Sequence, residues 1–300
     1  MSLAVLFAGQ GHQHADMLPW LSPSPLLRQM GERLECADWR AALADVGWAT
    51  RNATAQLVLT GTALAAWAEL APRLPGPVCW AGYSVGELAA FSAAGVFDGQ
   101  TALWLAQQRA AAMDRCGQAS PGGLVAWGGL GPDSVADICR SAGLHIAICN
   151  GDDAVIVGGP WPALLHGEQL AVARGAQVTR LAVSVASHTP AMRQAAATFA
   201  GLLATVAAKA PRGVLFSNVG GRVRSAERAA QVLSAQIAET VRWRDCMEEV
   251  RGRQPRCVLE IGPGQALARL WSRRYPEIPA RSCDEFRSVA AIERWVGRWL

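Results

Sequence analysis

The chain has 300 residues, of which 51% are apolar and 17% charged, and this composition predicts a folded globular protein and excludes a disordered one. A chain of this length is long enough for one large core with a smaller unit attached. The net charge is +4, and the sequence has no dense run of basic residues of the kind that forms a nucleic-acid-binding surface. A mild basic excess suits an acidic protein partner or an anionic substrate.

The hydropathy, cysteine and histidine patterns argue against a membrane protein, a disulfide-bonded protein and a zinc protein. No basic segment precedes the first apolar run, and residues 52–68, although uncharged, carry Asn, Thr and Gln throughout, so we expect a cytoplasmic protein without a membrane span. The eight cysteines form no CxxC pair and no zinc spacing with the five histidines, which predicts reduced thiols. His12 and His14 have no acid or thiol cluster beside them, so we expect loop histidines and no metal site.

The predicted elements begin with an apolar strand over residues 2–7, which runs into the loop AGQGHQ over residues 8–13. Such a glycine-flanked loop exposes backbone N–H groups at the carboxyl end of a strand, where they can bind an oxyanion; the alternative is a plain turn. Two helical segments follow over 24–46 and 52–71, because apolar residues recur there at helical spacing.

The most informative stretch covers residues 76–97, where a short apolar run ends in GYSVG and continues into an Ala/Leu/Glu segment. This pattern predicts a strand, a tight turn and a helix, with Glu87 complementing the dipole at the helix start. A serine on such a turn has its hydroxyl lifted clear of the sheet, and the flanking glycines let strand and helix approach closely. We interpret the stretch as a nucleophile elbow with Ser84 as its nucleophile; the alternative is an ordinary turn serine.

A helix is predicted over residues 100–113, apolar except for Arg109, which on this evidence alone is best explained by a solvated face. The stretch 117–123, GQASPGG, is a candidate domain boundary. Residues 123–187 then show the order βαββαβ, which predicts an inserted ferredoxin-like unit that returns the chain to its host.

The chain rejoins the host at residues 187–190, SHTP, and continues with a long helix, a strand over 214–219, further helices and a last strand over 257–262. Alternating strands and helices predict an α/β fold with a mainly parallel sheet covered on both faces. We therefore expect one large domain, residues 1–122 with 188–300, and an inserted subdomain, residues 123–187.

A serine nucleophile needs a base, and histidine is the side chain whose ordinary pKa permits that role near neutral pH. Of the five histidines we favour His188, because it lies where the chain rejoins the sheet; the alternative is a histidine beside a helix start without chemistry. No single aspartate stands out as the group that orients it, so a backbone carbonyl or an amide is an open alternative.

Six motifs together resemble the malonyl-CoA:acyl carrier protein transacylase family, in order and along nearly the whole chain: FAGQGHQ, GYSVGELAA, QQRAAAM, CNGDDAVIVGG, VSVASHTPAM and LEIGPGQAL. The resemblance implies an α/β-hydrolase-like core with a ferredoxin-like insert. It also implies ping-pong transfer of a malonyl group from a coenzyme A thioester to an acyl carrier protein, without a bound cofactor, metal, membrane or nucleic acid. The roles that it implies are nucleophile for Ser84, base for His188, oxyanion-hole N–H groups for Gln10 and Val85, carboxylate ligand for Arg109, site support for Asn150, and orientation of the histidine by the carbonyl of Gln236.

The chain departs from that family at three positions around the site: Tyr83 replaces a histidine, Ala8 a proline, and His12 a small residue. With Tyr83, the segment 280–295 and a short MLPWL pattern are more similar to the epsilon subunit of malonate decarboxylase, which loads malonyl onto that enzyme's own carrier subunit. The alternative carrier is that of fatty-acid or polyketide synthesis.

Two other classes of function remain open from the sequence. A hydrolase of esters or thioesters shares the elbow but requires an acid between Ser84 and His188 in the chain, and Asp152 and Asp153 lie in the predicted insert. A non-catalytic subunit that docks a carrier protein would use a basic face made of Arg251, Arg253, Arg256, Arg273 and Arg274.

Overall fold

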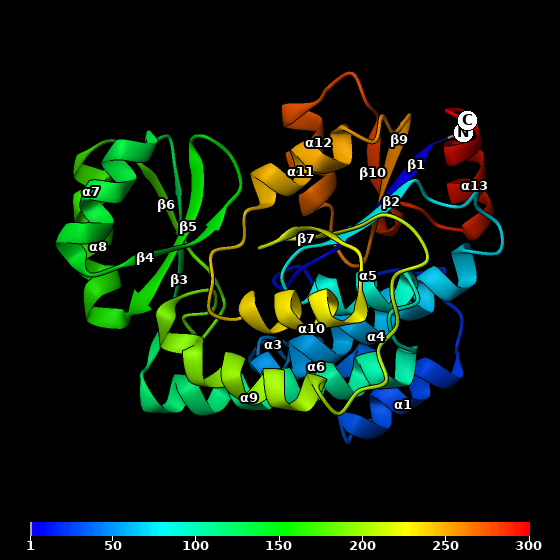
Figure 1. The fold of residues 1–300 in the computed structure, drawn as a ribbon, viewed down its shortest axis with the longest axis horizontal. Coiled ribbons are helices and arrows are strands. Elements are labelled where there is room, and N and C mark those ends of the chain that lie inside the picture. Colours follow the sequence, from blue (N-terminus) through cyan, green and yellow to red (C-terminus); the bar gives the residue numbers. More distant parts are fainter. Residues whose placement is uncertain (1) are drawn as a thin grey trace.

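A six-stranded sheet lies at the centre of the larger part of the computed structural model, which describes residues 2–300 (Figure 1). The strands follow the order β10 (Ala280–Ser282), β9 (Cys257–Ile261), β1 (Leu3–Phe7), β2 (Cys79–Gly82), β7 (Leu215–Ser217) and β8 (Gly221–Val223). Neighbouring strands are parallel except β7 and β8. The mainly parallel sheet expected from the sequence is therefore confirmed.

Both faces of this sheet are buried, and the alternation of side chains along β1 shows how. Leu3, Val5 and Phe7 enter one apolar core, whereas Ala4 and Leu6 enter another on the opposite face. The first core is built with α1 (Pro25–Arg33), α4 (Asn52–Leu70), α5 (Gly86–Ala93), α6 (Gly99–Ala119), α9 (Arg193–Leu203), α10 (Ala226–Ala235) and α13 (Val289–Gly297), and the second with α11 (Trp243–Arg251) and α12 (Ala266–Arg274). Within residues 2–300 no helix is long and apolar enough to cross a bilayer.

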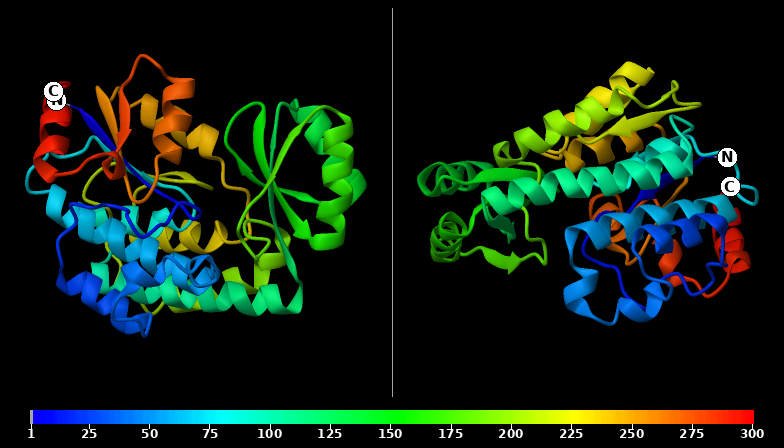
Figure 2. Two further views of the ribbon diagram at one scale, coloured as in Figure 1. Left: turned by 180° about the vertical axis from the view of Figure 1, so that it is seen from behind. Right: turned by 90° about the horizontal axis from the view of Figure 1, so that it is seen from below.

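A second, antiparallel sheet stands at one end of the molecule, as Figures 1 and 2 show from three directions. Its strands follow the order β4 (His145–Cys149), β5 (Ala154–Pro160), β3 (Gly122–Gly128) and β6 (Gln177–Arg180). The helices α7 (Pro132–Ala142) and α8 (Trp161–Ala173) pack on one face, so the chain order is βαββαβ, as predicted. The proposed division at residues 122/123 and 187/188 stays a prediction, and residue 1 lies outside the described part of the chain.

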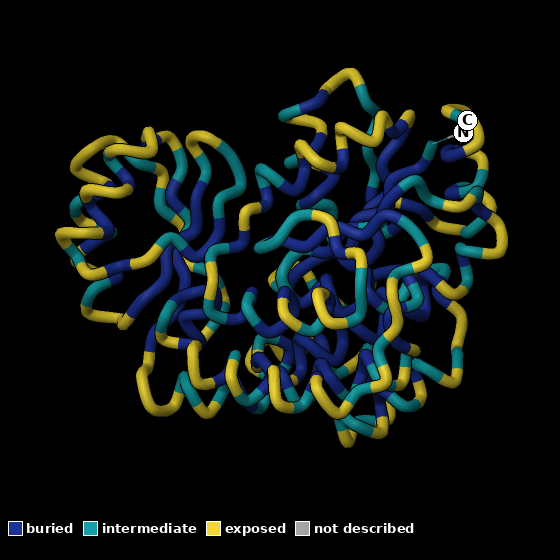
Figure 3. Tube along the Cα trace, viewed as in Figure 1, coloured by how far each residue is buried: buried dark blue, intermediate teal, exposed yellow. Residues whose placement is uncertain are grey.

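The other face of the small sheet turns toward the large one. Leu124 and Ile156 belong to the same apolar core as the α11 and α12 side of the six-stranded sheet. Figure 3 shows buried backbone along the strands of both sheets and exposed residues along the outer helices. The space between the two sheets is therefore where a site with an apolar wall can form.

The helix predicted over residues 24–46 is wrong, since the structure divides it into three pieces. After α1 ends, Glu35 adopts a positive φ of 50°, and two short helices follow, α2 (Trp39–Ala42) and α3 (Val46–Ala49). Asp38 and Asp45 each accept a hydrogen bond from the backbone three residues on, which starts a new turn instead of continuing the old one.

Other differences concern the ends of elements. Helix α6 runs on to Ala119, through much of the stretch 117–123 that was expected to be a break. Strand β6 stops at Arg180, and the long helix after His188 begins as a 3₁₀ turn over Pro190–Met192 before α9. Strands β8 and β10 have three residues each, too few to show a period of two in the sequence.

Candidate active site

Ser84 lies on the turn between β2 and α5 with a positive φ of 53°, which costs free energy for any residue other than glycine. A Cβ atom on Gly82 would overlap the main-chain carbonyl of Gly86. A Cβ atom on Gly86 would overlap the carbonyl of Phe7 and lie 2.6 Å from that of Ala8. The two glycines of the elbow are therefore required by close contact between backbones, and the turn they permit presents the Ser84 side chain at the carboxyl end of the sheet.

The Ser84 hydroxyl meets a histidine directly. Its Oγ lies 2.7 Å from Nε2 of His188, while Nδ1 of that ring lies 2.5 Å from the main-chain oxygen of Gln236. A carbonyl can only accept, so Nδ1 carries the proton and Nε2 is free to accept from the serine. Burial, and after it the positive charge of Arg109, lower the pKa of His188 to about 3, so the imidazole is neutral near pH 7. The pair is arranged for proton transfer from Ser84 to His188.

The position that an acid occupies in a hydrolase triad is filled by the backbone. The main-chain oxygen of Gln236 orients His188, which corresponds to the carbonyl alternative left open by the sequence. Asp152 lies in the loop between β4 and β5, largely exposed, and pairs with Arg244 at 3.0 Å instead of with the histidine. The structure therefore lacks, in the described residues, the Ser…Asp…His contact that the hydrolase alternative requires.

Behind the serine lies a buried polar network around the side chain of Gln236. Its Nε2 donates to the main-chain oxygen of Ser84 at 3.0 Å and to Oε2 of Glu87 at 3.1 Å, and its Oε1 accepts from Nη2 of Arg109 at 3.0 Å. Nη1 of Arg109 donates to Oε1 of Gln56 at 2.8 Å. Arg109 is only 1% exposed, so its interpretation as a solvated residue is wrong.

The buried carboxyl group of Glu87 is the charge that opposes the effect of burial on Arg109. Burial lowers the pKa of Arg109 to about 10, against the opposing effect of Glu87, so the guanidinium stays charged at neutral pH. Its Nε has no hydrogen-bond partner among the described residues, although the atom is buried. An unpartnered buried donor is costly, so this nitrogen is one donor of the site whose hydrogen bond is not made.

Gln10 and Val85, the two residues expected to supply oxyanion N–H groups, lie at adjacent strand ends. Strands β1 and β2 are parallel and paired up to Phe7 and Gly82, so the loop after β1 and the elbow after β2 emerge side by side. Val85 is 2% exposed and stands at the start of α5, where backbone N–H groups point out of the helix. This is the arrangement in which two N–H groups from different loops can converge on one oxygen.

A cavity of about 200 Å³ opens above these groups, between the two sheets. Its polar side holds Gln10, Ser84, His188, Tyr83 and Asn150, and the hydroxyl of Tyr83 donates to Oδ1 of Asn150 at 3.0 Å. The apolar side is formed by residues of the small sheet and of α12, among them Leu124, Ile148, Ile156, Leu181, Leu267 and Leu270. Neither Arg109 nor Gln236 lines this cavity; Arg109 is joined to the cavity residue His188 through Gln236, which contacts both.

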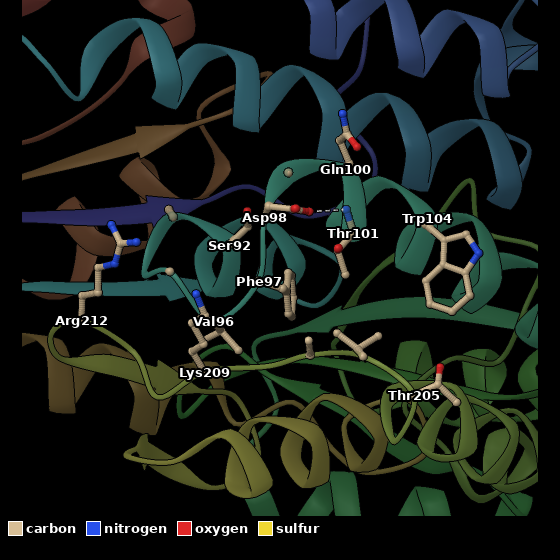
Figure 4. A pocket seen from close by; sticks show the side chains of 15 residues that line it. Ser92, Val96, Phe97, Asp98, Gln100, Thr101, Trp104, Thr205, Lys209 and Arg212 are labelled. Atoms are coloured by element: carbon tan, nitrogen blue, oxygen red, sulfur yellow. Dashed lines mark hydrogen bonds between the residues drawn. The ribbon is translucent and has the colours of Figure 1, made fainter.

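Larger grooves lie elsewhere, and the one in Figure 4 is remote from the serine. This groove, of about 790 Å³, is lined by Phe97, Trp104, Lys209 and Arg212 among others. It lies at the far end of α5, whereas Ser84 precedes the start of that helix. None of the predicted site residues lines it.

Sequence reasoning missed two residues of the site, Gln56 and Asn218, and it also missed the burial and the partners of Glu87. Asn218 accepts the N–H of Ser84 at 2.9 Å and donates to the oxygen of Gly82 at 2.7 Å. Glu87 is fully buried, so it does more than complement a helix dipole. The only available signal was a polar residue inside an otherwise apolar helical stretch, which marks both Gln56 and Glu87 but gives no partner.

The two histidines of the loop after β1, His12 and His14, have different neighbours. Nε2 of His14 lies 3.1 Å from Oδ2 of Asp284, a carboxylate that also accepts the N–H of Gly264 at 2.7 Å. His12 lines the cavity, and burial lowers its pKa. Over residues 2–300 no three potential ligands gather in a way that could hold a metal ion.

An α/β fold with a serine on an elbow, a histidine within hydrogen-bond distance of it and a second unit over the pocket is typical of proteins that form an acyl ester on a serine. In agreement, residues 5–295 match the family described as Acyl transferase domain. The transacylase named malonyl CoA-acyl carrier protein transacylase from Mycobacterium tuberculosis is 33% identical over 291 residues, 93% of this chain and 95% of that one. The chain belongs to the acyl transferase family and, within it, to the malonyl-CoA:acyl carrier protein transacylases.

Further relatives agree along the whole length. The transacylase of the same name from Haemophilus influenzae is 27% identical and covers 98% of both chains. Among solved structures, the transacylase from Coxiella burnetii superimposes with a TM-score of 0.91 at 25% identity, over 100% of this chain and 98% of that one. The transacylase from Xanthomonas oryzae gives 0.90 at 28% identity, over 100% and 99%.

Proposed function

We propose that this chain transfers a malonyl group from malonyl-CoA to the prosthetic-group thiol of an acyl carrier protein, through an ester on Ser84. The observation that carries the proposal is the 2.7 Å contact between Ser84 Oγ and the neutral His188 Nε2. That contact lies on a cavity walled by apolar side chains, and exclusion of water favours transfer to a thiol over hydrolysis.

Substrate binding is assigned to Arg109, which would pair with the free carboxylate of malonyl. In the structure its two terminal nitrogens donate to the amide oxygens of Gln56 and Gln236, and Arg109 does not line the cavity, so a bound carboxylate would replace at least one of these amide partners. The unpartnered Nε adds a third donor, and a guanidinium edge binds a carboxylate bidentately. An acetyl group offers no such carboxylate, which makes Arg109 the selectivity residue. Asn150, held by Tyr83, is assigned to supporting the acyl group from the insert.

In the first chemical step, the Oγ of Ser84 attacks the thioester carbonyl carbon while its proton passes to Nε2 of His188. The N–H groups of Gln10 and Val85 stabilise the resulting oxyanion, and loss of one such donor typically costs about 2.7–4 kcal/mol. The C–S bond then breaks, and the coenzyme A thiolate takes the proton from His188. The product is a malonyl ester on Ser84.

In the second half, the thiol of a carrier's prosthetic arm replaces coenzyme A and the same groups act in reverse. His188 accepts the thiol proton, the thiolate attacks the ester carbonyl, and the serine oxygen leaves with that proton. The carbonyl of Gln236 holds the ring in the tautomer that both halves require. Two half-reactions through one covalent intermediate make the kinetics ping-pong.

Mass spectrometry after incubation with malonyl-CoA tests the proposal. Wild type should gain one malonyl group, Ser84→Ala should gain none, and holo-carrier protein should discharge the adduct. Arg109→Ala should lose malonyl loading far more than acetyl loading. A wild-type chain that stays unmodified, or that releases free malonate steadily without a carrier, contradicts the proposal.

We further propose that the physiological carrier is the carrier subunit of malonate decarboxylase. Support comes from the sequence around Tyr83 and residues 280–295, which is more similar to the epsilon subunit of that enzyme. The competing carrier is that of fatty-acid or polyketide synthesis, and one solved relative is a malonyl transacylase bound to its type II polyketide synthase carrier, at a TM-score of 0.90 and 26% identity over 98% of this chain. Transfer rates to the two kinds of purified holo-carrier, compared in one assay, decide between them; a faster rate with the fatty-acid carrier rejects this assignment.

A further inference from the structure

A buried carboxylate stands behind the reacting pair without a part in the steps above. Glu87 is the second residue of α5 and is fully buried. Its Oε1 accepts the backbone N–H of Asn218 at 2.6 Å, and its Oε2 accepts Nε2 of Gln236 at 3.1 Å. Both of these neighbours are donors, and the hydroxyl of Ser217 also lowers the pKa of Glu87 through a hydrogen bond, so the surroundings favour the ionised carboxylate, which can accept at both oxygens.

The two neighbours of Glu87 lead to the two reacting side chains by separate routes. Asn218 accepts the N–H of Ser84 through Oδ1 and donates through Nδ2 to the oxygen of Gly82, so it clamps the elbow from both sides of the serine. Gln236 offers its main-chain oxygen to His188, and its side-chain amide also contacts the oxygen of Ser84. One carboxylate thus braces the nucleophile and the base at once.

We propose, resting on the acyl-transfer function above, that Glu87 is a positioning residue that holds Ser84 and His188 in reacting geometry by accepting hydrogen bonds from Asn218 and Gln236. Protonation of Glu87 would set an O–H group against an N–H donor and break one of the two contacts. The reaction rate then depends on the ionisation of Glu87, although this side chain touches no reacting atom.

The surroundings of Glu87 shift its pKa into a pH range in which enzyme rates can be measured. Burial raises its pKa to about 7, opposed by the hydrogen bonds and by Arg109 on α6. The other titratable group whose charge interacts with it is the buried thiol of Cys246 on α11, whose pKa is raised well above its usual value by burial, so it stays neutral. His188, with a pKa of about 3, stays neutral down to much lower pH. Glu260, which lines the same cavity, has its pKa raised to about 8 by burial, and a variant of it separates its titration from the loss of rate below about pH 7 that we assign to Glu87.

The experiment measures acylation of Ser84 in Glu87→Gln, which keeps the size of the side chain but presents an N–H₂ group to one of the two donors. At saturating malonyl-CoA and pH 8, the rate of acylation should fall about 100-fold, as expected for a small displacement of reacting groups, while KM for malonyl-CoA changes less than threefold. In wild type the rate of acylation should fall as pH decreases through about 7, which we call the acid limb. This limb should be absent in Glu87→Gln. A rate that is unchanged, or a limb that persists in Glu87→Gln, overturns the proposal.

Glu260 supplies a matched control. It is also a fully buried carboxylate, its pKa is raised to about 8 by burial, and it accepts two backbone N–H groups, those of Leu267 and Ala268. It lines the same cavity as Ser84 and His188, but it has no contact with Gln236 or Asn218 in the described hydrogen bonds, so it tests a buried carboxylate of the site that does not brace the reacting pair. The limb near pH 7 should therefore persist in Glu260→Gln; if it disappears there and stays in Glu87→Gln, the assignment to Glu87 is wrong.

A fluorophosphonate probe separates this proposal from the proposed function. Its phosphorus is attacked by the oxygen of Ser84, fluoride leaves, and the serine proton passes to His188, so the reaction needs the aligned pair but no malonyl group. Labelling should show the same limb and the same loss in Glu87→Gln, even if malonyl-CoA proves not to be the substrate. If Glu87→Gln does not fold, Gln236→Met keeps the main-chain oxygen and removes the link; labelling at the wild-type rate in that variant overturns the proposal.

Discussion

Replacing Arg109 by methionine tests the electrostatics of the buried network most directly. The substitution keeps much of the side-chain volume but removes the charge that faces Glu87 and the donors that fill Gln56 and Gln236. Removing one partner of a buried charge pair costs about 3–5 kcal/mol, and although Arg109 and Glu87 are joined only through Gln236, the substitution also leaves the amide oxygens of Gln56 and Gln236 without their donor. We expect Arg109→Met to lower the free energy of unfolding by about that amount at pH 8.

The cost should depend on pH, with a sign that the pKa shifts decide. Arg109 opposes the burial effect that raises the pKa of Glu87 to about 7, so removing Arg109 raises this pKa further. Between the two values, the folded variant binds more protons than the folded wild type, whereas the unfolded chains bind equally. The stability of the variant therefore falls relative to wild type as pH rises from about 6 to 8.

Chemical denaturation of both proteins at pH 6, 7 and 8 measures this difference. Arg33→Met is a matched control, because Nη1 of Arg33 donates to Gln107 of the same helix α6 at 2.8 Å without a buried carboxylate nearby. The control should lose about 0.5–1.5 kcal/mol, independent of pH. A difference between Arg109→Met and wild type that is constant from pH 6 to 8 would refute the electrostatic coupling between Arg109 and Glu87.

Three further predictions concern single contacts of the site. His188→Ala should slow formation of the acyl-enzyme by about 10²–10⁴-fold, measured by rapid quench; a loss below tenfold denies it the role of base. Gly86→Ala should destabilise the fold by at least about 1–3 kcal/mol in thermal unfolding, because its Cβ would overlap main-chain atoms, whereas Gly201→Ala meets nothing within 4 Å and should not. Tyr83→Phe leaves Oδ1 of Asn150 without its donor and should cost about 1–3 kcal/mol of stability; an unchanged melting temperature argues against the 3.0 Å bond.

The sequence predicts those parts of the site that are local. The spacing of Gly82, Ser84 and Gly86 can be read within five residues, although the contact that requires Gly86 is made with the carbonyls of Phe7 and Ala8 at the end of the neighbouring strand. His188 is found by elimination, because few histidines compete for the role. The parallel sheet is predicted from the alternation of strands with helices along the chain and from continuous apolar runs such as β1, which are typical of strands buried on both faces.

The supporting contacts are different in kind. The orientation of His188 depends on a main-chain oxygen, and a carbonyl leaves no trace in the identity of residue 236. The contacts of Glu87 join residues 131 and 149 positions apart, and no period or spacing connects such partners. Short helices are missed by the sequence analysis for a related reason. The helices α2 and α3 have four residues each, and they are started by the side-chain caps Asp38 and Asp45 without a periodic apolar face that could reveal them.

In the described part of the chain, a main-chain oxygen and not a carboxylate contacts Nδ1 of His188, and this affects how the protein can distinguish malonyl from acetyl groups. After burial, the charge of Arg109 is the largest influence that lowers the pKa of this histidine. A malonyl carboxylate paired with Arg109, as proposed, offsets that charge and so makes His188 a stronger base at the moment the substrate is in place. An acetyl group leaves the charge of Arg109 unchanged and meets a weaker base. Discrimination between the two acyl groups should therefore appear in kcat as well as in KM, because in the proposed mechanism one guanidinium would both bind the substrate and influence the pKa of the base.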